Sequence, residues 1–372
     1  MWEYEQPVKI VFGNGSINRL GEIIESNGYK RGLLVTSNFF IKSRLAEKLK
    51  EDKLNKIINI FSEVEPNPTV INVDNCADVI RKNNVDFIVA LGGGSVIDCA
   101  KASGTIALTN DSIKKYHGTN LNMPNNSIPI IAVPTTSGTG SEVTCVSVIT
   151  DRELGKKAPI VSKSFYPKIA FIDPELTYSL TDRITASTGI DVLCHAIEGY
   201  WSKGHQPICD ALAVHSSKLV FKYLKIAYKN PNDRLAKEKL AEASTIAGLA
   251  FTLPKTTASH ACSFHLTSKY NIPHGEACGL TLDYFTRING ERDERVRELS
   301  RLLGFKDPNE MADKIYILKM ELGLLVDLKH LKLKDKDILE LVEKSKGGNL
   351  LNNPVDINDD MLLEMYTKLS KS

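Results

Sequence analysis

Six of the eight histidines in this chain of 372 residues lie between positions 195 and 274. Asp191 and His195 are four residues apart in a segment with helical periodicity, so both side chains should lie on one face of a helix, one turn apart. His274 follows between a proline and a glycine. One carboxylate and three imidazoles without a thiol suit Fe²⁺ or Zn²⁺ and argue against a structural cysteine-type zinc site. The pattern therefore predicts a metal centre, with His260 and His265 also in this region.

Other titratable residues near this region have two interpretations. A single histidine on an apolar helix is more often a hydrogen-bonded core residue than a metal ligand. Glu198 and Asp210 share the helical region of the Asp191–His195 pair, where each could orient a ligand or face solvent. The remaining histidines have polar neighbours and are expected at the surface: His117, His205, His215 and His330.

Two glycine-rich loops each follow a strand-like apolar run, at residues 92–95 and 134–142. Glycine lets the backbone turn sharply and approach a phosphate, and a helix N-terminus adds free N–H donors. Either loop alone could be a plain connection, and the first departs from the GxGxxG spacing. Two of them at the carboxyl ends of one sheet predict a dinucleotide site. Its candidate residues are Gly92, Gly93, Gly94, Ser95, Asp98, Thr135, Thr136, Ser137, Thr139 and Ser141.

The elements that must position these groups differ between the two halves of the chain. Short β-rich runs alternate with helical segments in the first half, which is typical of a parallel sheet covered by helices. Beyond Ser179 the patterns are helical only. We predict an α/β domain with a Rossmann-like parallel sheet over residues 1–178 and an all-α domain over 179–372. The expected strands are Val8–Phe12, Leu33–Thr36, Ile57–Phe61, Phe87–Leu91, Pro129–Pro134 and Ile169–Ile172.

Composition excludes several classes of function. Forty-seven Lys+Arg against 45 Asp+Glu leave a net charge of +2, so no large field favours nucleic acid. No apolar run is long enough for a membrane span, and the N-terminus lacks a signal-peptide pattern. Seven cysteines without a CxxC pair are expected to be free, buried thiols. We expect a cytoplasmic protein that acts on a small molecule, with a homodimer left open.

Over nearly its whole length the chain resembles the iron-containing (group III) alcohol dehydrogenase family. The motifs that carry the resemblance are GGGSVIDCAK at 92–101, PTTSGTGSEVT at 134–144, the Asp191/His195 helix and IPHG at 272–275. The resemblance implies a dehydroquinate synthase-like architecture with a divalent metal, Fe²⁺ or Zn²⁺, in the cleft between a dinucleotide-binding and a helical catalytic domain. It implies that the metal polarises an aldehyde carbonyl while NADH or NADPH gives hydride. The implied metal ligands are Asp191, His195, His260 and His274, and the implied further cofactor contacts are Asn67 and Lys157.

Two departures from the family pattern affect these expectations. Phe264 stands where the family often has a histidine near the nicotinamide, so no catalytic acid is assigned beyond the metal site. Ser37 stands where NAD-preferring members have aspartate. Without that carboxylate a 2′-phosphate is not repelled, so we expect NADPH to be accepted and preferred.

Within the family, segments 207–210, 258–264 and 351–356 look most like phosphonoacetaldehyde reductases, which form 2-hydroxyethylphosphonate. Lys255, five residues before His260, would then face the anionic tail, although a solvated lysine at a helix start is the plainer interpretation. The alternatives are a reductase for sulfoacetaldehyde, succinic semialdehyde or butanal, and a polyol dehydrogenase or dehydroquinate synthase-like enzyme of the same architecture. A non-enzymatic nucleotide- or metal-binding protein is the alternative of another class.

Overall fold

The computed structural model describes residues 2–119 and 121–371, which form two compact units. An α/β unit contains Glu5–Thr136 and Gly140–Ser179. A helical unit contains Leu180–Ser372 together with Met1–Tyr4 and Ser137–Thr139.

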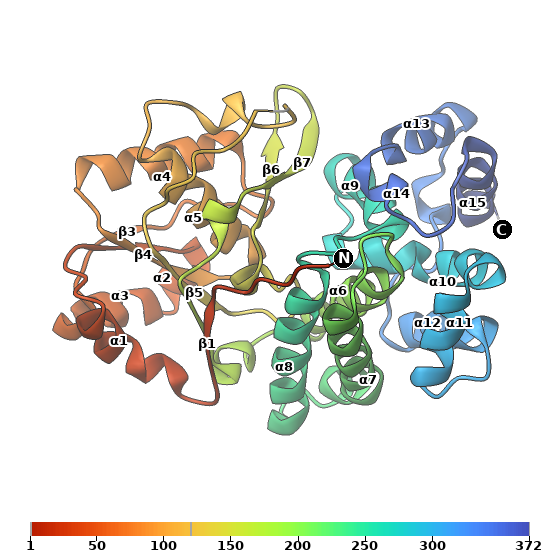
Figure 1. The fold of residues 1–372 in the computed structure, drawn as a ribbon, viewed down its shortest axis with the longest axis horizontal. Coiled ribbons are helices and arrows are strands. Elements are labelled where there is room, and N and C mark those ends of the chain that lie inside the picture. The colour runs from red at the N-terminus through yellow and green to blue at the C-terminus, as the bar shows by residue number, and fades with distance from the viewer. Residues whose placement is uncertain (1, 120, 372) are drawn as a thin grey trace. The chain divides into compact units, whose positions relative to one another are not determined.

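The α/β unit is built on a six-stranded parallel sheet (Figure 1). All six predicted strands are present. The sheet places the two strands that lead into the glycine loops next to each other, with Gly92 paired to Pro134. In spatial order the strands are β1 (Lys9–Phe12), β8 (Ile169–Ile172), β5 (Ile130–Pro134), β4 (Phe87–Gly92), β2 (Gly32–Val35) and β3 (Ile57–Phe61).

Helices cover both faces of this sheet because its central strands are apolar on both sides. In β4, Ile88 and Ala90 pack toward α4 and α5, whereas Val89 and Leu91 pack toward α1 and α3. Thr69 and Asn72 form a capping box that fixes the start of α4. The bounds of the helices are α1 (Leu20–Ser26), α2 (Asn38–Lys42), α3 (Leu45–Glu51), α4 (Val70–Lys82) and α5 (Gly94–Ile106).

One element of this unit is absent from the sequence-based expectation. Strands β6 (Val146–Asp151) and β7 (Lys156–Val161) form an antiparallel hairpin. Most residues of β7 are exposed or half-exposed, and the strand includes two lysines and Pro159. A strand with this composition lacks the alternation of apolar and polar residues that would reveal it.

The second unit contains helices and, among its described residues, no strand. Helix α6 is almost wholly buried because α7, α8 and α10 pack around it. The predicted fold class, an α/β half followed by a helical half, is therefore confirmed. The helices are α6 (Asp182–Trp201), α7 (Pro207–Lys229), α8 (Arg234–Phe251), α9 (Ala258–Tyr270), α10 (His274–Arg292), α11 (Glu294–Leu302), α12 (Pro308–Glu321), α13 (Asp335–Ser345), α14 (Gly348–Leu351) and α15 (Asp359–Lys371).

The structure also tests the expectations for the cysteines, for a membrane span and for His117. All seven cysteines are buried and free, as predicted. In the described part of the chain, no helix has the length and apolar character that a bilayer span requires. The prediction that His117 lies at the surface is wrong, because its ring is buried and its Nε2 lies 2.9 Å from the carbonyl oxygen of Ile149.

Candidate metal centre and dinucleotide loops

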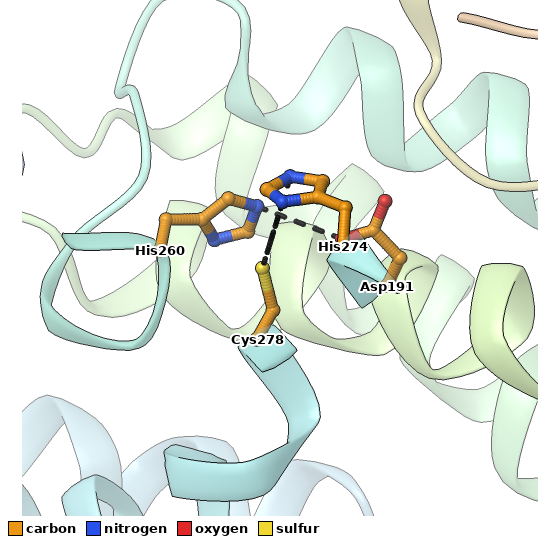
Figure 2. Close-up of side chains that lie close together, drawn as sticks. All are labelled: Asp191, His260, His274 and Cys278. Atoms are coloured by element: carbon orange, nitrogen blue, oxygen red, sulfur yellow. Dashed lines mark hydrogen bonds and ion pairs between the residues drawn. The ribbon is translucent and has the colours of Figure 1, made fainter. Parts of the chain in front are cut away.

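Three helices of the helical unit bring the predicted metal ligands together (Figure 2). Donor atoms of Asp191, His260, His274 and Cys278 all lie within 4.8 Å of one another. His260 Nε2 is 3.7 Å from one oxygen of Asp191, and His195 Nδ1 is 4.0 Å from the other. The rings of His195 and His260 are 4.6 Å apart between centres. Three of the four ligands implied by the resemblance, Asp191, His260 and His274, thus share this group with Cys278, and His195 lies beside it against Asp191 and His260.

The close approach of α10 to α6 explains why a glycine follows His274. A Cβ atom on Gly275 would lie 1.9 Å from the carbonyl oxygen of Ser187 and 2.8 Å from Cβ of Asp191. Only glycine lets the two backbones come this close. His274, the first residue of α10, is thereby held next to Asp191 on α6.

Glu198 fixes the orientation of one candidate ligand, His260. Its carboxylate is fully buried and accepts a short hydrogen bond from Nδ1 of His260. The other oxygen accepts from the hydroxyl of Thr257 and the backbone N–H of Ser259, each at 2.7 Å, and Trp201 Nε1 donates to Thr257 at 2.8 Å. A carboxylate on Nδ1 keeps the proton there and leaves the Nε2 lone pair facing the cluster.

The two open interpretations of Glu198 and Asp210 are resolved differently. Glu198 contacts a candidate ligand through His260. Asp210 instead lies beside His205 at 3.2 Å and Arg295 at 3.1 Å. Glu198 orients the site, and Asp210 belongs to a separate ion-pair group.

The chemistry of the cluster fits a divalent cation. Burial, and next the neighbouring His260, hold the pKa of His195 well below its ordinary value, so its imidazole is neutral at pH 7. Nδ1 of His195 is buried and makes no hydrogen bond. Neutral imidazoles beside one carboxylate are the donors that catalytic zinc and iron sites use.

Aromatic rings flank the cluster. Phe251 stacks on His195, with ring centres 4.2 Å apart and planes 11° from parallel. Phe264 lies nearly parallel to the ring of His274, at 6.2 Å. These rings make the surroundings apolar, and neither can transfer a proton.

The group of candidate donors also includes a thiol, that of Cys278, which the expected donor set lacks. Its Sγ lies 3.8 Å from Nε2 of His274, one helical turn earlier on α10. Burial, and next the charge of Asp191, raise the pKa of the thiol well above its ordinary value. The spacing of four residues that relates Asp191 to His195 also relates His274 to Cys278, so the sequence contained this feature.

The two glycine loops are in contact within the α/β unit. A Cβ atom on Gly92 would lie 2.5 Å from the side chain of Val96, and one on Gly93 would lie 3.2 Å from the hydroxyl of Thr136. Gly94 and Ser95 begin α5, directly after this turn. Small residues here keep the backbone N–H groups at the start of α5 accessible, as a phosphate site requires.

The buried carboxylate of Asp98, on α5, connects the two glycine loops. One carboxylate oxygen accepts from the hydroxyl of Ser141 at 2.5 Å, and the other from the backbone N–H of Val148 at 2.9 Å. Lys101, fully buried, donates to Ser141 and Thr144 at 2.7 and 3.1 Å. Burial lowers the pKa of Lys101 to about 8, against the opposing effect of the Asp98 charge.

The other candidate cofactor residues fall into three places. Asn67 has a left-handed backbone (φ 57°); its N–H donates to Ser95 at 3.1 Å, and its side-chain oxygen accepts from Lys157 at 2.8 Å. Ser37 follows β2 and forms a backbone bridge with Glu63. The second loop is divided: Thr135, Thr136 and Ser141 belong to the α/β unit, and Ser137 and Thr139 to the helical unit.

Lys255 is exposed and has a left-handed backbone, with φ at 65°. Its N–H donates to the carbonyl of Phe251 at 2.7 Å. Asn352 donates to the carbonyls of Pro254 and Thr256 at 2.9 and 3.1 Å. The structure thus joins the segment before His260 to segment 351–356, both of which the sequence associates with the substrate.

Comparisons with known proteins agree over both halves of the chain. A model described as iron-containing alcohol dehydrogenase matches residues 7–174, and one for the C-terminal part of that family matches residues 185–370. The crystal structure of a sulfoacetaldehyde reductase from Bifidobacterium kashiwanohense in complex with NAD⁺ is 56% identical, covers 100% of this chain and 99% of its own, and has a TM-score of 0.96. Alcohol dehydrogenase 4 of Schizosaccharomyces pombe is 34% identical over 96% of this chain and 86% of its own length. The 1,3-propanediol dehydrogenase of Citrobacter freundii is 33% identical over 98% of both chains.

Proposed function

We propose that this chain, which belongs to the iron-containing alcohol dehydrogenase family, is a metal-dependent, NAD(H)-linked reductase of small aldehydes that carry an anionic group. As a family member it is an oxidoreductase that interconverts alcohols and aldehydes. The observation that carries the proposal is that Asp191, His260 and His274 gather in one group of metal-binding side chains in the helical unit, with His195 beside Asp191.

In this proposal the four clustered side chains hold the metal, and the α/β domain of residues 1–178 holds the dinucleotide. When bound, the metal supplies Lewis-acid polarisation of an oxygen and NAD(H) supplies the hydride. The contribution of the protein is alignment: Glu198 holds the His260 ring, and Gly275 lets His274 approach Asp191. Phe251 and Phe264 place apolar ring surface beside the ligands. The final proton comes from water or a ribose hydroxyl, because Phe264 has none to give.

The cofactor proposal joins the loops to the comparison. The reductase from B. kashiwanohense was crystallised with NAD⁺, which supports NADH as the reductant of this chain. The phosphates would lie at the start of α5, with Asn67 and Lys157 near the adenosine end. The NAD⁺ complex of that reductase supports NADH rather than the expected preference for NADPH. Since Ser37 carries no charge, we propose that NADPH is accepted as well.

For the substrate, two lines support a two-carbon aldehyde with an anionic tail. The 56% identity to a sulfoacetaldehyde reductase favours sulfoacetaldehyde, and the segments noted in the sequence favour its phosphonate analogue. Lys255 offers a cation on a segment that Asn352 holds in place. A non-glycine residue in the left-handed region costs about 1 kcal/mol, so this backbone is maintained by its hydrogen bonds.

A substrate panel tests this proposal. NADH consumption is followed with sulfoacetaldehyde, phosphonoacetaldehyde, succinic semialdehyde and butanal on the metal-loaded enzyme. We expect kcat/KM for the first or second aldehyde to exceed that for butanal by about tenfold or more, as one charge-assisted contact provides. A preference for butanal would contradict the anionic substrate, and the absence of turnover with every aldehyde would contradict the reductase.

A further inference from the structure

Cys278 lies among the candidate metal ligands rather than behind them. Its Sγ is 3.8 Å from Nε2 of His274 and within 4.8 Å of donor atoms on Asp191 and His260 (Figure 2). The side chain is fully buried, and it lies on the same face of α10 as His274 because four residues separate them.

The distances agree with donors that share an ion. A zinc ion with nitrogen at about 2.1 Å and sulfur at about 2.3 Å places the two donors about 3.6 Å apart at a tetrahedral angle. Sγ lies 3.8 Å from Nε2 and 3.9 Å from Nδ1 of His274, and the distance to Nε2 is close to this separation.

A buried cysteine on the adjacent helix α9 does not share this arrangement. Cys262 lies on α9 two residues after the ligand His260, and it is buried like Cys278. It faces Tyr366 and Ser345 instead of the cluster. Among the described residues, Cys278 is the cysteine that joins a group of metal-binding side chains.

We propose that Cys278 is a thiolate donor to the metal centre and makes this centre favour thiophilic ions such as Zn²⁺ and Co²⁺ over Mn²⁺. This inference rests on the proposed function, since it concerns the same metal. Binding forms a sulfur–metal bond, and the S–H proton leaves to solvent. Thiolate ligands select zinc, whereas carboxylate, carbonyl and water ligands suit manganese.

Cobalt substitution tests the thiolate directly. Metal-free wild type, Cys278→Ser and Cys262→Ser are titrated with Co²⁺ and their absorption spectra are compared. We expect a sulfur-to-cobalt charge-transfer band in wild type and in the Cys262→Ser control but not in Cys278→Ser. The visible d–d bands should appear in all three. Competition between Zn²⁺ and Mn²⁺ should show Zn²⁺ affinity about tenfold or more weaker in Cys278→Ser, with Mn²⁺ affinity nearly unchanged.

A second measurement avoids the variant, should Cys278→Ser not fold. X-ray absorption of zinc-loaded wild type should contain a sulfur shell at about 2.3 Å. A shell of nitrogen and oxygen only, or a charge-transfer band that survives in Cys278→Ser, would overturn the inference. If Co²⁺ gives d–d bands without the charge-transfer band, this inference fails alone. If Co²⁺ does not bind wild type at all, the proposed metal centre fails with it.

Discussion

The buried carboxylate of Glu198 accepts hydrogen bonds from His260, Thr257 and Ser259, so its removal should loosen a metal ligand without deleting one. We expect Glu198→Gln to weaken metal binding about 10- to 100-fold, as for other partners of ligating histidines. Chelator competition measures this affinity. Glu276→Gln is the matched control, because Glu276 is also buried but bonds Arg183 and Leu325. Equal metal affinity in wild type and Glu198→Gln would refute the orienting role.

Lys255 should decide how well the enzyme recognises a charged substrate. Lys255→Ala should raise KM for sulfoacetaldehyde about tenfold or more and leave butanal nearly unaffected, because one charge-assisted contact to the anion is lost. Lys332→Ala is the matched control, since Lys332 is also exposed and also has a positive φ, 50°. Equal losses with both aldehydes would show that Lys255 does not contact the anion.

Residue spacing explains what could be predicted about the metal centre. The helical repeat relates Asp191 to His195, and the Pro–His–Gly segment singles out His274. The role of the other residues depends on burial, which distant segments determine. Glu198 contacts the site only because α9 packs against it, and its own sequence neighbours do not show this. The prediction that His117 lies at the surface is wrong for the same reason. Its polar sequence neighbours do not reveal that it is buried next to β6.

At the scale of elements, Asp98 and Lys101 connect α5 to the segment after the second loop. Lys101→Met should destabilise the α/β unit by about 3 kcal/mol, because removing one member of a buried pair leaves the other without its counter-charge. Urea unfolding measures the free energy. The double variant Asp98→Asn/Lys101→Met should lose less than the sum of the single variants. Strict additivity of the two losses would mean that the two side chains do not act as a pair.

The choice between NADH and NADPH should depend on residue 37, which follows β2. An aspartate at position 37 would accept a hydrogen bond from the ribose 2′-hydroxyl of NADH and repel the 2′-phosphate of NADPH. We expect Ser37→Asp to lower the ratio of kcat/KM for NADPH over NADH about tenfold or more. Ser26→Asp adds the same charge at an exposed position of the same unit and should leave the ratio unchanged. An unchanged ratio in Ser37→Asp would mean that the 2′-position lies elsewhere.

The accuracy of the predicted elements follows from their burial. Strands β4 and β5 are buried throughout, so their continuous apolar runs stand out in the sequence. Helix α4 has a clear start because Thr69 caps it. Strand β7 has no such features, and its pairing with β6 depends on a partner five residues away at the turn, which composition does not reveal.

At the scale of the whole molecule, the chain combines two units with different chemistry. The parallel sheet presents two adjacent glycine loops, and the helical unit presents a largely buried group of one carboxylate, two imidazoles and a thiol, with the imidazole of His195 beside it. The division into an α/β half and a helical half could be predicted from the change of periodicity near residue 178. The close contact of Gly275 with Ser187 could not be predicted, because these two residues lie on different helices and are nearly ninety positions apart in the sequence.

Metal removal is the direct test of whether this metal centre drives the NADH-linked reduction of an anionic aldehyde. NADH consumption with sulfoacetaldehyde is measured on wild type and His274→Ala before chelation, after chelation and after Fe²⁺ or Zn²⁺ is restored. A Lewis acid contributes several kcal/mol, so wild type should lose at least about a hundredfold of its rate on chelation and regain it with metal. His274→Ala should be folded by circular dichroism and inactive throughout. Full activity of metal-free wild type, or a near-normal rate in chelated His274→Ala, would show that the reduction does not need this metal centre.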